Sequence, residues 1–274
     1  MIEVIEPGLS TTVQDDGRFG NYHIGMPPSG AMDQFAHRVG NRLVGNDEHA
    51  ATLEMTYVGG TFEFESEAVV AVTGAEMSPT LEGEPIDPWT AVEVPAGATL
   101  SFEYATDGAR TYLAVAGGID VAPVMGSRST YTLIGMGGYD GRSLEEGDEL
   151  AIGSQDARTP TVGASVAEEH RVGYDTTEPI RVVMGLCDYR LTDAGREAFL
   201  DAEWKVSDEA DRTGYRFDGP DVEPMFEERE PPFGAGTDIT NVVDVGYPIG
   251  SIQLAGEPIV LMRDAVTGGG YATV

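Results

Sequence analysis

The chain has 274 residues, of which 41% are hydrophobic and 23% charged, a composition typical of a globular protein of one or two domains. Its 47 acidic and 16 basic residues give a net charge of −31, and so acidic a surface repels nucleic acids and anionic membranes. No apolar run approaches the length of about 18 residues that a membrane span needs. The N-terminus also lacks the basic and apolar segments of a signal peptide. We therefore expect a cytoplasmic protein that binds neither nucleic acid nor membrane.

Lysine is almost absent, since Lys205 is the only one among the 16 cations. At molar salt the Debye length falls to about 3 Å, which screens the self-repulsion of an acidic surface. The composition thus indicates a salt-adapted, haloarchaeon-like source and a fold that weakens when salt is removed. It also excludes a Walker A loop, which needs Gly-Lys-Ser/Thr, and Lys205 does not lie in a biotin-attachment motif.

Cysteine and histidine restrict the chemistry further. Cys187 is the only cysteine, so no intrachain disulfide can form, as in a reducing compartment. Because it follows the apolar run 180–183, we interpret it as a core residue at a strand end. The histidines at 23, 37, 49 and 170 form no HExxH pattern and have no cysteine partners, so we expect no metal site. The Gly-x-Ser-x-Gly and Ser-x-x-Lys nucleophile motifs are absent as well.

The first element with a clear period is a helix over 32–43, where apolar residues recur at helical spacing. Ser29 or Asp33 is its expected N-cap, and Gly45-Asn46 ends it. A second helix is predicted at about 193–203, with Thr192 as its N-cap. Short apolar or alternating runs between glycines and prolines predict strands at 69–73, 91–95, 99–104, 110–115, 148–152, 180–184, 242–245, 251–254 and 258–262. Many short strands with few helices favour a mostly β fold, either a barrel or a sandwich.

The segment 154–179 is polar, contains prolines and lacks periodicity, so it is predicted to link two β-rich halves. The expected N-terminal domain is 1–155 and the expected C-terminal domain is 165–274.

A first group of polar residues lies between Pro7 and Asp33. Gln14 and Asp15 end a predicted strand, and a tight turn leads to Arg18. These three side chains either form a recess that can hold a carboxylate or an amide, or they are a polar turn with an Asp–Arg pair.

A second group lies on the first helix and the segment after it. Asn41 is on the flank of the helix, and Glu54 lies between Leu53 and Met55, which predicts burial. A buried carboxylate needs a partner or takes up a proton, so Glu54 is a structural ion pair or an acid/base group, and we favour the ion pair.

A third group follows the glycine-rich segments between 117 and 148. Arg128 and Arg142 can each bind an oxyanion through two hydrogen bonds, and the hydroxyls of Ser127, Ser129 and Thr130 are further donors. The alternative is a simple hairpin connection. Near the C-terminus, Arg212, Gln253, Asp264 and Thr267 lie in polar motifs or at strand ends, where site residues are often displayed.

The motifs in this order resemble the allophanate hydrolase subunit 2 family, also called biotin-dependent carboxyltransferase-like. The resemblance covers the whole chain and rests on Thr-Val-Gln-Asp (12–15), Ser-Gly-Ala-Met-Asp (29–33), Asn-Arg-Leu-Val-Gly-Asn (41–46), Leu-Glu-Met-Thr (53–56), Gly-Gly-Ile-Asp (117–120), Gly-Ser-Arg-Ser-Thr-Tyr (126–131), Gly-Arg-x-Leu-x-x-Gly-Asp (141–148), Asp-Arg-Thr-Gly-Tyr-Arg (211–216) and Asp-Ala-Val-Thr-Gly-Gly-Gly-Tyr (264–271). It implies two cyclophilin-like antiparallel β-barrels with a few short helices. Family members usually continue past the last motif into at least one further strand. Either a C-terminal segment is absent from this sequence or this member is short, and in both cases the second barrel would lack its last strand.

The resemblance further implies a hydrolase component that is active only in a complex. The A, B and C subunits of an ATP-dependent 5-oxoprolinase together open 5-oxoproline to glutamate. The chain would be the C subunit, with ATP used at a site that the sequence does not assign and no covalently bound cofactor. On this interpretation the acid/base candidates are Asp15, Glu54 and Asp264. The residues expected to contact a small amide or carboxylate substrate are Gln14, Arg18, Asp33, Asn41, Arg128, Ser129, Arg142, Arg212, Gln253 and Thr267.

Two alternatives stay open. The chain could be a carboxyltransferase module that moves CO2 from carboxybiotin to urea or another amide, and only this alternative requires biotin. It could also be a non-catalytic regulator that binds the kinase-inhibitor-like B subunit.

Overall fold

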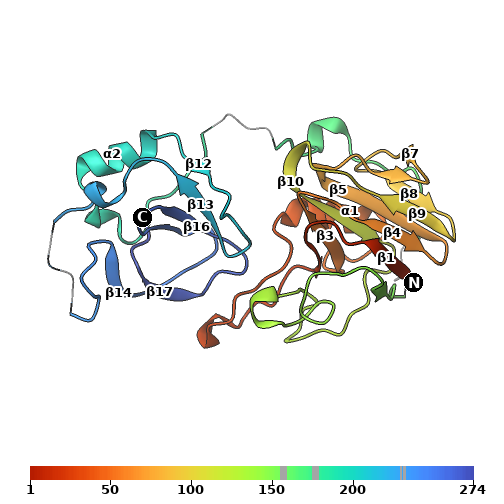
Figure 1. The fold of residues 1–274 in the computed structure, drawn as a ribbon, viewed down its shortest axis with the longest axis horizontal. Coiled ribbons are helices and arrows are strands. Elements are labelled where there is room, and N and C mark those ends of the chain that lie inside the picture. The colour runs from red at the N-terminus through yellow and green to blue at the C-terminus, as the bar shows by residue number, and fades with distance from the viewer. Residues whose placement is uncertain (155–158, 175–178, 229, 231–232) are drawn as a thin grey trace. The chain divides into compact units, whose positions relative to one another are not determined.

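The chain folds into two compact units (Figure 1). The structure is a computed structural model and describes residues 1–154, 159–174, 179–228, 230 and 233–274. The first unit comprises Met1–Arg18 and Ser29–Glu178, and the second comprises Phe19–Pro28 and Pro179–Val274. The chain therefore leaves the first unit after Arg18, contributes one segment to the second unit, and returns at Ser29.

Two antiparallel sheets make up most of the first unit. One has the strand order β11-β1-β4-β9-β6-β7 and the other the order β2-β3-β10-β5-β8. The elements of this unit are β1 (Ile2–Glu6), β2 (Thr11–Gln14), α1 (Gln34–Leu43), β3 (Thr52–Thr56), β4 (Thr61–Phe64), β5 (Ala68–Glu76), β6 (Thr80–Leu81), β7 (Glu84–Pro85), β8 (Ala91–Val94), β9 (Ala98–Ser101), β10 (Asp107–Val115), η2 (Thr132–Ile134), β11 (Glu149–Leu150) and η3 (Glu168–His170).

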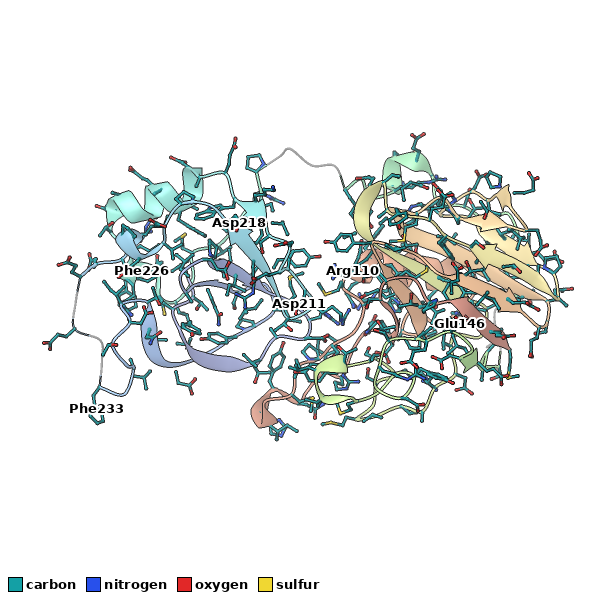
Figure 2. The ribbon with its side chains drawn as sticks, viewed as in Figure 1. Arg110, Glu146, Asp211, Asp218, Phe226 and Phe233 are labelled. Atoms are coloured by element: carbon teal, nitrogen blue, oxygen red, sulfur yellow. The ribbon has the colours of Figure 1, made fainter. Side chains whose placement is uncertain are left out.

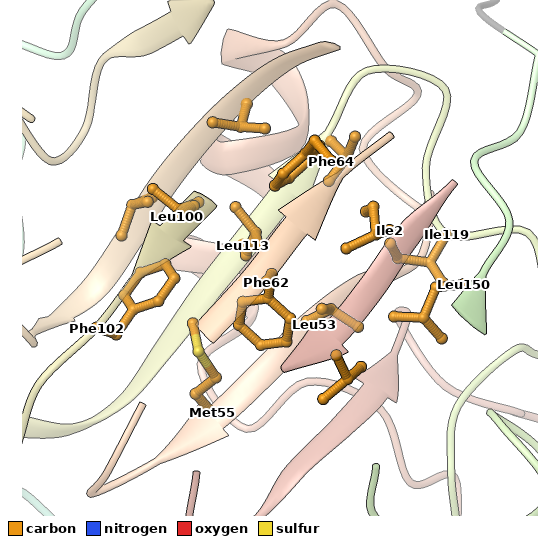
Figure 3. Packing of buried hydrophobic residues seen from close by; sticks show 14 of the residues in the cluster. Ile2, Leu53, Met55, Phe62, Phe64, Leu100, Phe102, Leu113, Ile119 and Leu150 are labelled. Carbon is orange, nitrogen blue, oxygen red and sulfur yellow. The ribbon is translucent and has the colours of Figure 1, made fainter. Parts of the chain in front are cut away.

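The two sheets share one apolar core, shown in Figure 3. Phe62 and Phe64 of β4 are buried, while the residues between and before them are only partly buried, as expected for a strand with one face on the core. Leu53 of β3 and Leu113 of β10 come to the same core from the other sheet. The strands of this second sheet are buried on both faces where α1 packs against β5 and β10.

Helix α1 begins at the cap that the sequence suggested, since Asp33 Oδ1 accepts a hydrogen bond from the backbone N–H of Ala36 at 2.9 Å. Ser29, the other candidate, is not the N-cap. Gly40 allows the close approach to the sheet, because a Cβ at this position would lie 2.9 Å from Thr73 Oγ1. Helix α2 (Asp193–Asp201) of the second unit is capped by Thr192, again as predicted.

Residues 159–174 lie in the first unit, although the sequence suggested a linker and the start of the second domain there. Ser165 forms a bridge with Thr90, and Tyr174 donates a hydrogen bond to Asp33 Oδ2 at 2.6 Å. These backbone and side-chain hydrogen bonds hold a segment that has no periodic pattern of its own. The remaining parts of the expected linker, 155–158 and 175–178, are outside the described residues.

The second unit has a four-stranded sheet in the order β12-β13-β16-β15 and a two-stranded sheet of β14 and β17. Its core contains Phe199, Phe226 (labelled in Figure 2) and Leu254. The elements of this unit are η1 (Tyr22–Ile24), η4 (Asp188–Arg190), α2 (Asp193–Asp201), β12 (Lys205–Val206), β13 (Gly214–Asp218), η5 (Glu223–Met225), β14 (Asn241–Gly246), β15 (Ile252–Leu254), β16 (Pro258–Leu261) and β17 (Gly268–Tyr271).

One predicted strand is wrong. Residues 180–184 are not in a strand, and Val183 is 91% exposed. The segment is rich in β-branched residues, but no described strand pairs with it, and β-propensity alone does not make a strand. Cys187 is nevertheless buried, at the start of η4 rather than at a strand end.

The mostly β class with a few short helices is confirmed. The closed cyclophilin-like barrels stay a prediction. None of the described helices has the length and apolar character needed to cross a membrane.

Candidate functional site

Asp15 lies directly after β2 and is the centre of a buried hydrogen-bond cluster. Its Oδ1 accepts from the hydroxyls of Ser127 at 2.6 Å and Ser129 at 2.5 Å, and from the backbone N–H of Gly17 at 2.8 Å. Its Oδ2 accepts from the backbone N–H of Arg128 at 2.5 Å. These four donors attach the 127–129 loop to the end of β2. In this structure the carboxylate therefore acts as an anchor for that loop.

Arg18 and Gln14 are buried beside the same loop. A terminal nitrogen of Arg18 donates to the carbonyl oxygen of Ser129. The Gln14 amide nitrogen donates to Thr12 Oγ1 at 2.9 Å and to the Thr130 carbonyl at 3.2 Å, while its Oε1 has no hydrogen-bond partner in the described part of the chain. The structure thus brings Gln14, Asp15, Arg18 and Ser129 together, as the motif suggested.

Glu54 is buried in a network that supports the structural interpretation. Its Oε2 accepts from the backbone N–H of Met32 and from the Tyr112 hydroxyl, both at 2.8 Å, and its Oε1 lies 3.6 Å from Arg110 Nε. The Tyr112 hydroxyl also accepts from the backbone N–H of Asp33 at 2.7 Å. Burial, together with the neighbouring Glu54 carboxylate, raises the pKa of Tyr112 well above its usual value, so Tyr112 remains a donor.

Asp33 and Asn41, both predicted to contact substrate, have local structural partners instead. Asp33 caps α1 and accepts from the Tyr174 hydroxyl. Asn41 is buried, donates to the Ala50 carbonyl at 2.8 Å, and accepts from the Asn46 side chain at 2.9 Å. These bonds hold the segment after α1 in place.

Arg142 also has a fixed partner. Its two terminal nitrogens donate to the two carboxylate oxygens of Asp148, at 2.7 and 2.8 Å. This hydrogen bonding holds the pKa of Asp148 below its usual value. Because the guanidinium fork is occupied within the fold, Arg142 is a poor candidate for anion binding.

Arg128 lies at a polar cavity of about 380 Å³ in the first unit, next to the Asp15 cluster. Small residues form much of its wall, and the charged or titratable side chains on it come from several segments. The small residues are Ala50, Ala51, Gly117, Gly118 and Gly153, and the titratable ones are Asp47, His49, Asp120 and Arg128. The volume is within the range of about 300 to 1,000 Å³ that is usual for small-molecule sites.

A histidine–aspartate pair at this cavity was not anticipated from the sequence. Asp16 accepts from Arg38 Nε at 3.2 Å and from Arg38 Nη2 at 2.7 Å, and it also pairs with Nδ1 of His49. Burial alone would raise the pKa of Asp16, but the hydrogen bonds from Arg38 and His49 lower it. The ionised carboxylate fixes the proton of His49 on Nδ1. His49 and Asp16 are 33 positions apart, and no spacing rule connects them.

His37 is a buried neighbour of this pair. Its Nδ1 is hydrogen-bonded to Thr52 Oγ1 at 3.0 Å, and its Nε2 lies 3.6 Å from Asp16 Oδ1. Burial lowers the pKa of His37 to about 4, although the nearby carboxylates act in the opposite direction. The imidazole is therefore neutral at physiological pH. Among the described residues, no group of three or more His, Cys, Asp and Glu side chains could hold a metal ion.

In the second unit, Asp264 is buried and paired with Arg212. Arg212 Nε donates to Asp264 Oδ2 at 2.7 Å, and Arg212 Nη2 donates to Oδ1 at 3.3 Å. The backbone N–H of Asp264 also donates to the Arg212 carbonyl at 2.9 Å. These contacts join the segment after β16 to the segment before β13, which is a structural role.

Gln253 and Thr267 have separate surroundings. Gln253 is buried on β15 and hydrogen-bonds to Tyr247, whose pKa is raised mainly by burial. Thr267 donates to the carbonyl of Tyr22 at 3.3 Å, which connects it to the Phe19–Pro28 segment of the same unit.

Residues 24–274 match the family model "Carboxyltransferase domain, subdomain A and B". The chain belongs to this family. It is 37% identical to the C subunit of 5-oxoprolinase from Escherichia coli, over all of this chain and 83% of that protein. It is also 30% identical to the C subunit of 5-oxoprolinase from Haemophilus influenzae, again over 83% of that protein.

Members of this carboxyltransferase family also occur inside much larger enzymes. The chain is 35% identical to urea amidolyase of Saccharomyces cerevisiae over 98% of its own length, but it spans only 15% of that enzyme. The crystal structure of the Kluyveromyces lactis urea carboxylase has a TM-score of 0.88 at 34% identity, over 99% of this chain and 25% of that one. The K. lactis urea amidolyase gives a TM-score of 0.90 at the same identity, over 17% of its chain.

Proposed function

We propose that the chain is the C subunit of an ATP-dependent 5-oxoprolinase and acts with the A and B subunits. The supporting observation is the 37% identity to the C subunit of the E. coli 5-oxoprolinase, which extends over all of this chain and most of that protein. The likeness to urea amidolyase has similar identity but covers a small part of that enzyme.

The proposed reaction opens the lactam ring of 5-oxoproline. Water adds across the amide bond: the carbonyl carbon gains a hydroxyl group, the C–N bond breaks, and the ring nitrogen takes up a proton to become the amine of glutamate. Hydrolysis of ATP drives this step because an unstrained amide is a poor electrophile. We assign neither ATP nor a covalent cofactor to this chain. Its part of the site would be formed around Gln14, Arg18, Ser129 and Arg128.

The experiment measures glutamate release and ATP hydrolysis from 5-oxoproline at molar salt. The chain is assayed alone, then with the B subunit, and then with the A and B subunits together. Turnover that requires all three components is expected. A stable complex with the B subunit that never turns over 5-oxoproline, even when the A subunit is added, contradicts the proposal.

Carboxyl transfer is the second candidate, and the observation that favours it is the TM-score of 0.90 to the K. lactis urea amidolyase. In that reaction CO2 passes from carboxybiotin to urea or another amide, with biotin supplied on a separate carrier. Transfer from a carboxylated biotin carrier to urea, measured in the same preparations, distinguishes it from 5-oxoproline opening.

A further inference from the structure

Gly117, Gly118 and Gly153 form a glycine wall on one side of the cavity beside the Asp15 cluster. Their backbone N–H groups already donate hydrogen bonds within the fold. The N–H of Gly117 donates to Asn46 Oδ1 at 2.7 Å, that of Gly118 to the Val115 carbonyl at 2.8 Å, and that of Gly153 to the Gly118 carbonyl at 2.9 Å. These bonds hold the glycine wall in one conformation. A ligand in the cavity must therefore be recognised mainly by side chains.

Arg128 is the guanidinium on this wall, and the described residues orient it without occupying its fork. Its backbone N–H is held by Asp15, and its Nε donates to the Val121 carbonyl at 2.9 Å. One terminal nitrogen lies 3.8 Å from Asp120, and the described residues provide no hydrogen bond to either terminal nitrogen. This differs from Arg142 and Arg212, whose forks are filled by a carboxylate. An oriented, unfilled fork is suited to a ligand carboxylate.

The other polar groups of the cavity show which ligand would fit beside that carboxylate. His49 pairs with Asp16 through Nδ1, which leaves its Nε2 as the ring nitrogen available to a ligand, 4.0 Å from Glu48 Oε1. Asp47 and Asp120 add two carboxylates to the wall. A ligand with only anionic groups would be repelled by these two residues. A ligand that combines a carboxylate with an N–H donor is complementary to the whole set.

We propose that this cavity binds a small carboxylic acid that also carries an N–H group, either an amino acid or a lactam acid, with its carboxylate on Arg128. The carboxylate subsite is argued from the cavity alone. The choice of 5-oxoproline within this class rests on the proposed function. The N–H group would lie toward Asp47, Asp120 or His49.

Isothermal titration calorimetry on the full chain tests the site, with 5-oxoproline, glutamate and 2-pyrrolidinone as probes at constant salt. 2-Pyrrolidinone has the lactam ring but no carboxylate, so we expect it to bind at least about tenfold more weakly than 5-oxoproline. Arg128→Gln should weaken 5-oxoproline binding by about tenfold or more. Arg128→Lys, which keeps the charge but not the fork, should give an intermediate value.

Arg196→Gln is the matched control, because Arg196 is a similarly exposed arginine (39% against 41%) in a surface pair with Asp188. It should leave binding unchanged. Thermal unfolding of each variant shows whether the fold is intact, and Arg128→Lys keeps the test valid if Arg128→Gln does not fold. The proposal is overturned if the wild-type chain binds none of the acids, if 2-pyrrolidinone binds as well as 5-oxoproline, or if both folded Arg128 variants bind like wild type.

The same measurements separate this site from the proposed function. Turnover of 5-oxoproline by the complete complex, combined with binding that does not depend on Arg128, rejects the site and leaves the function. Binding of carboxylic acids that depends on Arg128, without 5-oxoproline turnover in the complex, supports the site and rejects the function.

Discussion

Ser129 and Asp15 bond to each other in both directions. The Ser129 hydroxyl donates to Asp15 Oδ1 at 2.5 Å and accepts from the Asp15 backbone N–H at 3.1 Å. One hydroxyl thus satisfies both a main-chain donor and a carboxylate, which fixes the rotamer of Ser129. Arg128 is the preceding residue in the same loop, so its position at the cavity depends on this pair.

Asp15→Asn should destabilise the first unit. The amide removes the negative charge and turns an NH2 group toward hydrogen-bond donors, so a loss of about 2 to 4 kcal/mol in the free energy of unfolding is expected. Denaturant unfolding of the full chain at molar salt measures it. Asp87→Asn changes an exposed aspartate of the same unit and should stay within about 0.5 kcal/mol. An Asp15→Asn variant that is fully stable but inactive would show instead that Asp15 is an acid/base group.

Asp264→Asn should destabilise the second unit by about 3 kcal/mol, because it removes the charge of the carboxylate that pairs with the Arg212 guanidinium, which is only 15% exposed. The comparison is Glu257→Gln, which breaks the more exposed pair with Arg216 and should cost about 1 kcal/mol or less. Both variants are compared by denaturant unfolding of the full chain. Equal effects of the two substitutions would contradict the structural role of Asp264.

His37 should make stability depend on pH. Its pKa is about 4 in the folded chain, against 6.5 for an unperturbed histidine, so the unfolded chain binds the proton more readily. The contribution of His37 to the free energy of unfolding is therefore fully present above pH 6.5. It is lost as the pH falls toward 4, by about 3 kcal/mol in total. This loss of stability is measured from unfolding midpoints at several pH values between 6.5 and 4.

His37→Gln, whose side chain does not titrate, should flatten this dependence. The control His23→Gln removes an exposed histidine and should retain the wild-type slope. A wild-type slope in the His37→Gln variant would show that other groups carry the pH dependence.

Salt should raise the thermal stability. With a net charge of −31, self-repulsion opposes the compact state at low ionic strength and is screened at molar salt. We expect Tm to rise by about 10 °C or more between about 0.1 and 2 M KCl. NaCl should give a similar increase, since screening depends on ionic strength. A Tm independent of KCl would contradict the proposed salt adaptation.

Sequence patterns predicted correctly those elements that are stabilised by residues close to one another in the sequence. Helix α1 and its Asp33 cap follow from helical periodicity and from a side chain three positions before its bonding partner. The 180–184 segment was misassigned because a strand requires a partner, and the local sequence contains no information about one.

For the candidate site, too, the sequence predicted some features and only the structure shows the others. The motif around Gln14, Asp15 and Arg18 correctly indicated residues that lie together, because they are close in sequence and flank one turn. The pattern could not show which arginines are already occupied. Arg142 and Arg212 resemble Arg128 in sequence, but Asp148 and Asp264 fill their guanidinium forks.

By itself, the sequence determined the mostly β class, the acidic surface and the set of polar residues around β2 and the glycine-rich segments. These depend on composition and on periods of a few residues. The tertiary structure decided that Asp15 anchors a loop, that Asp16 orients His49 across 33 positions, and that Arg128 lies at a cavity where no described residue fills its fork. Hydrogen bonding and burial act between atoms that folding brings together, and distance along the chain does not encode that proximity.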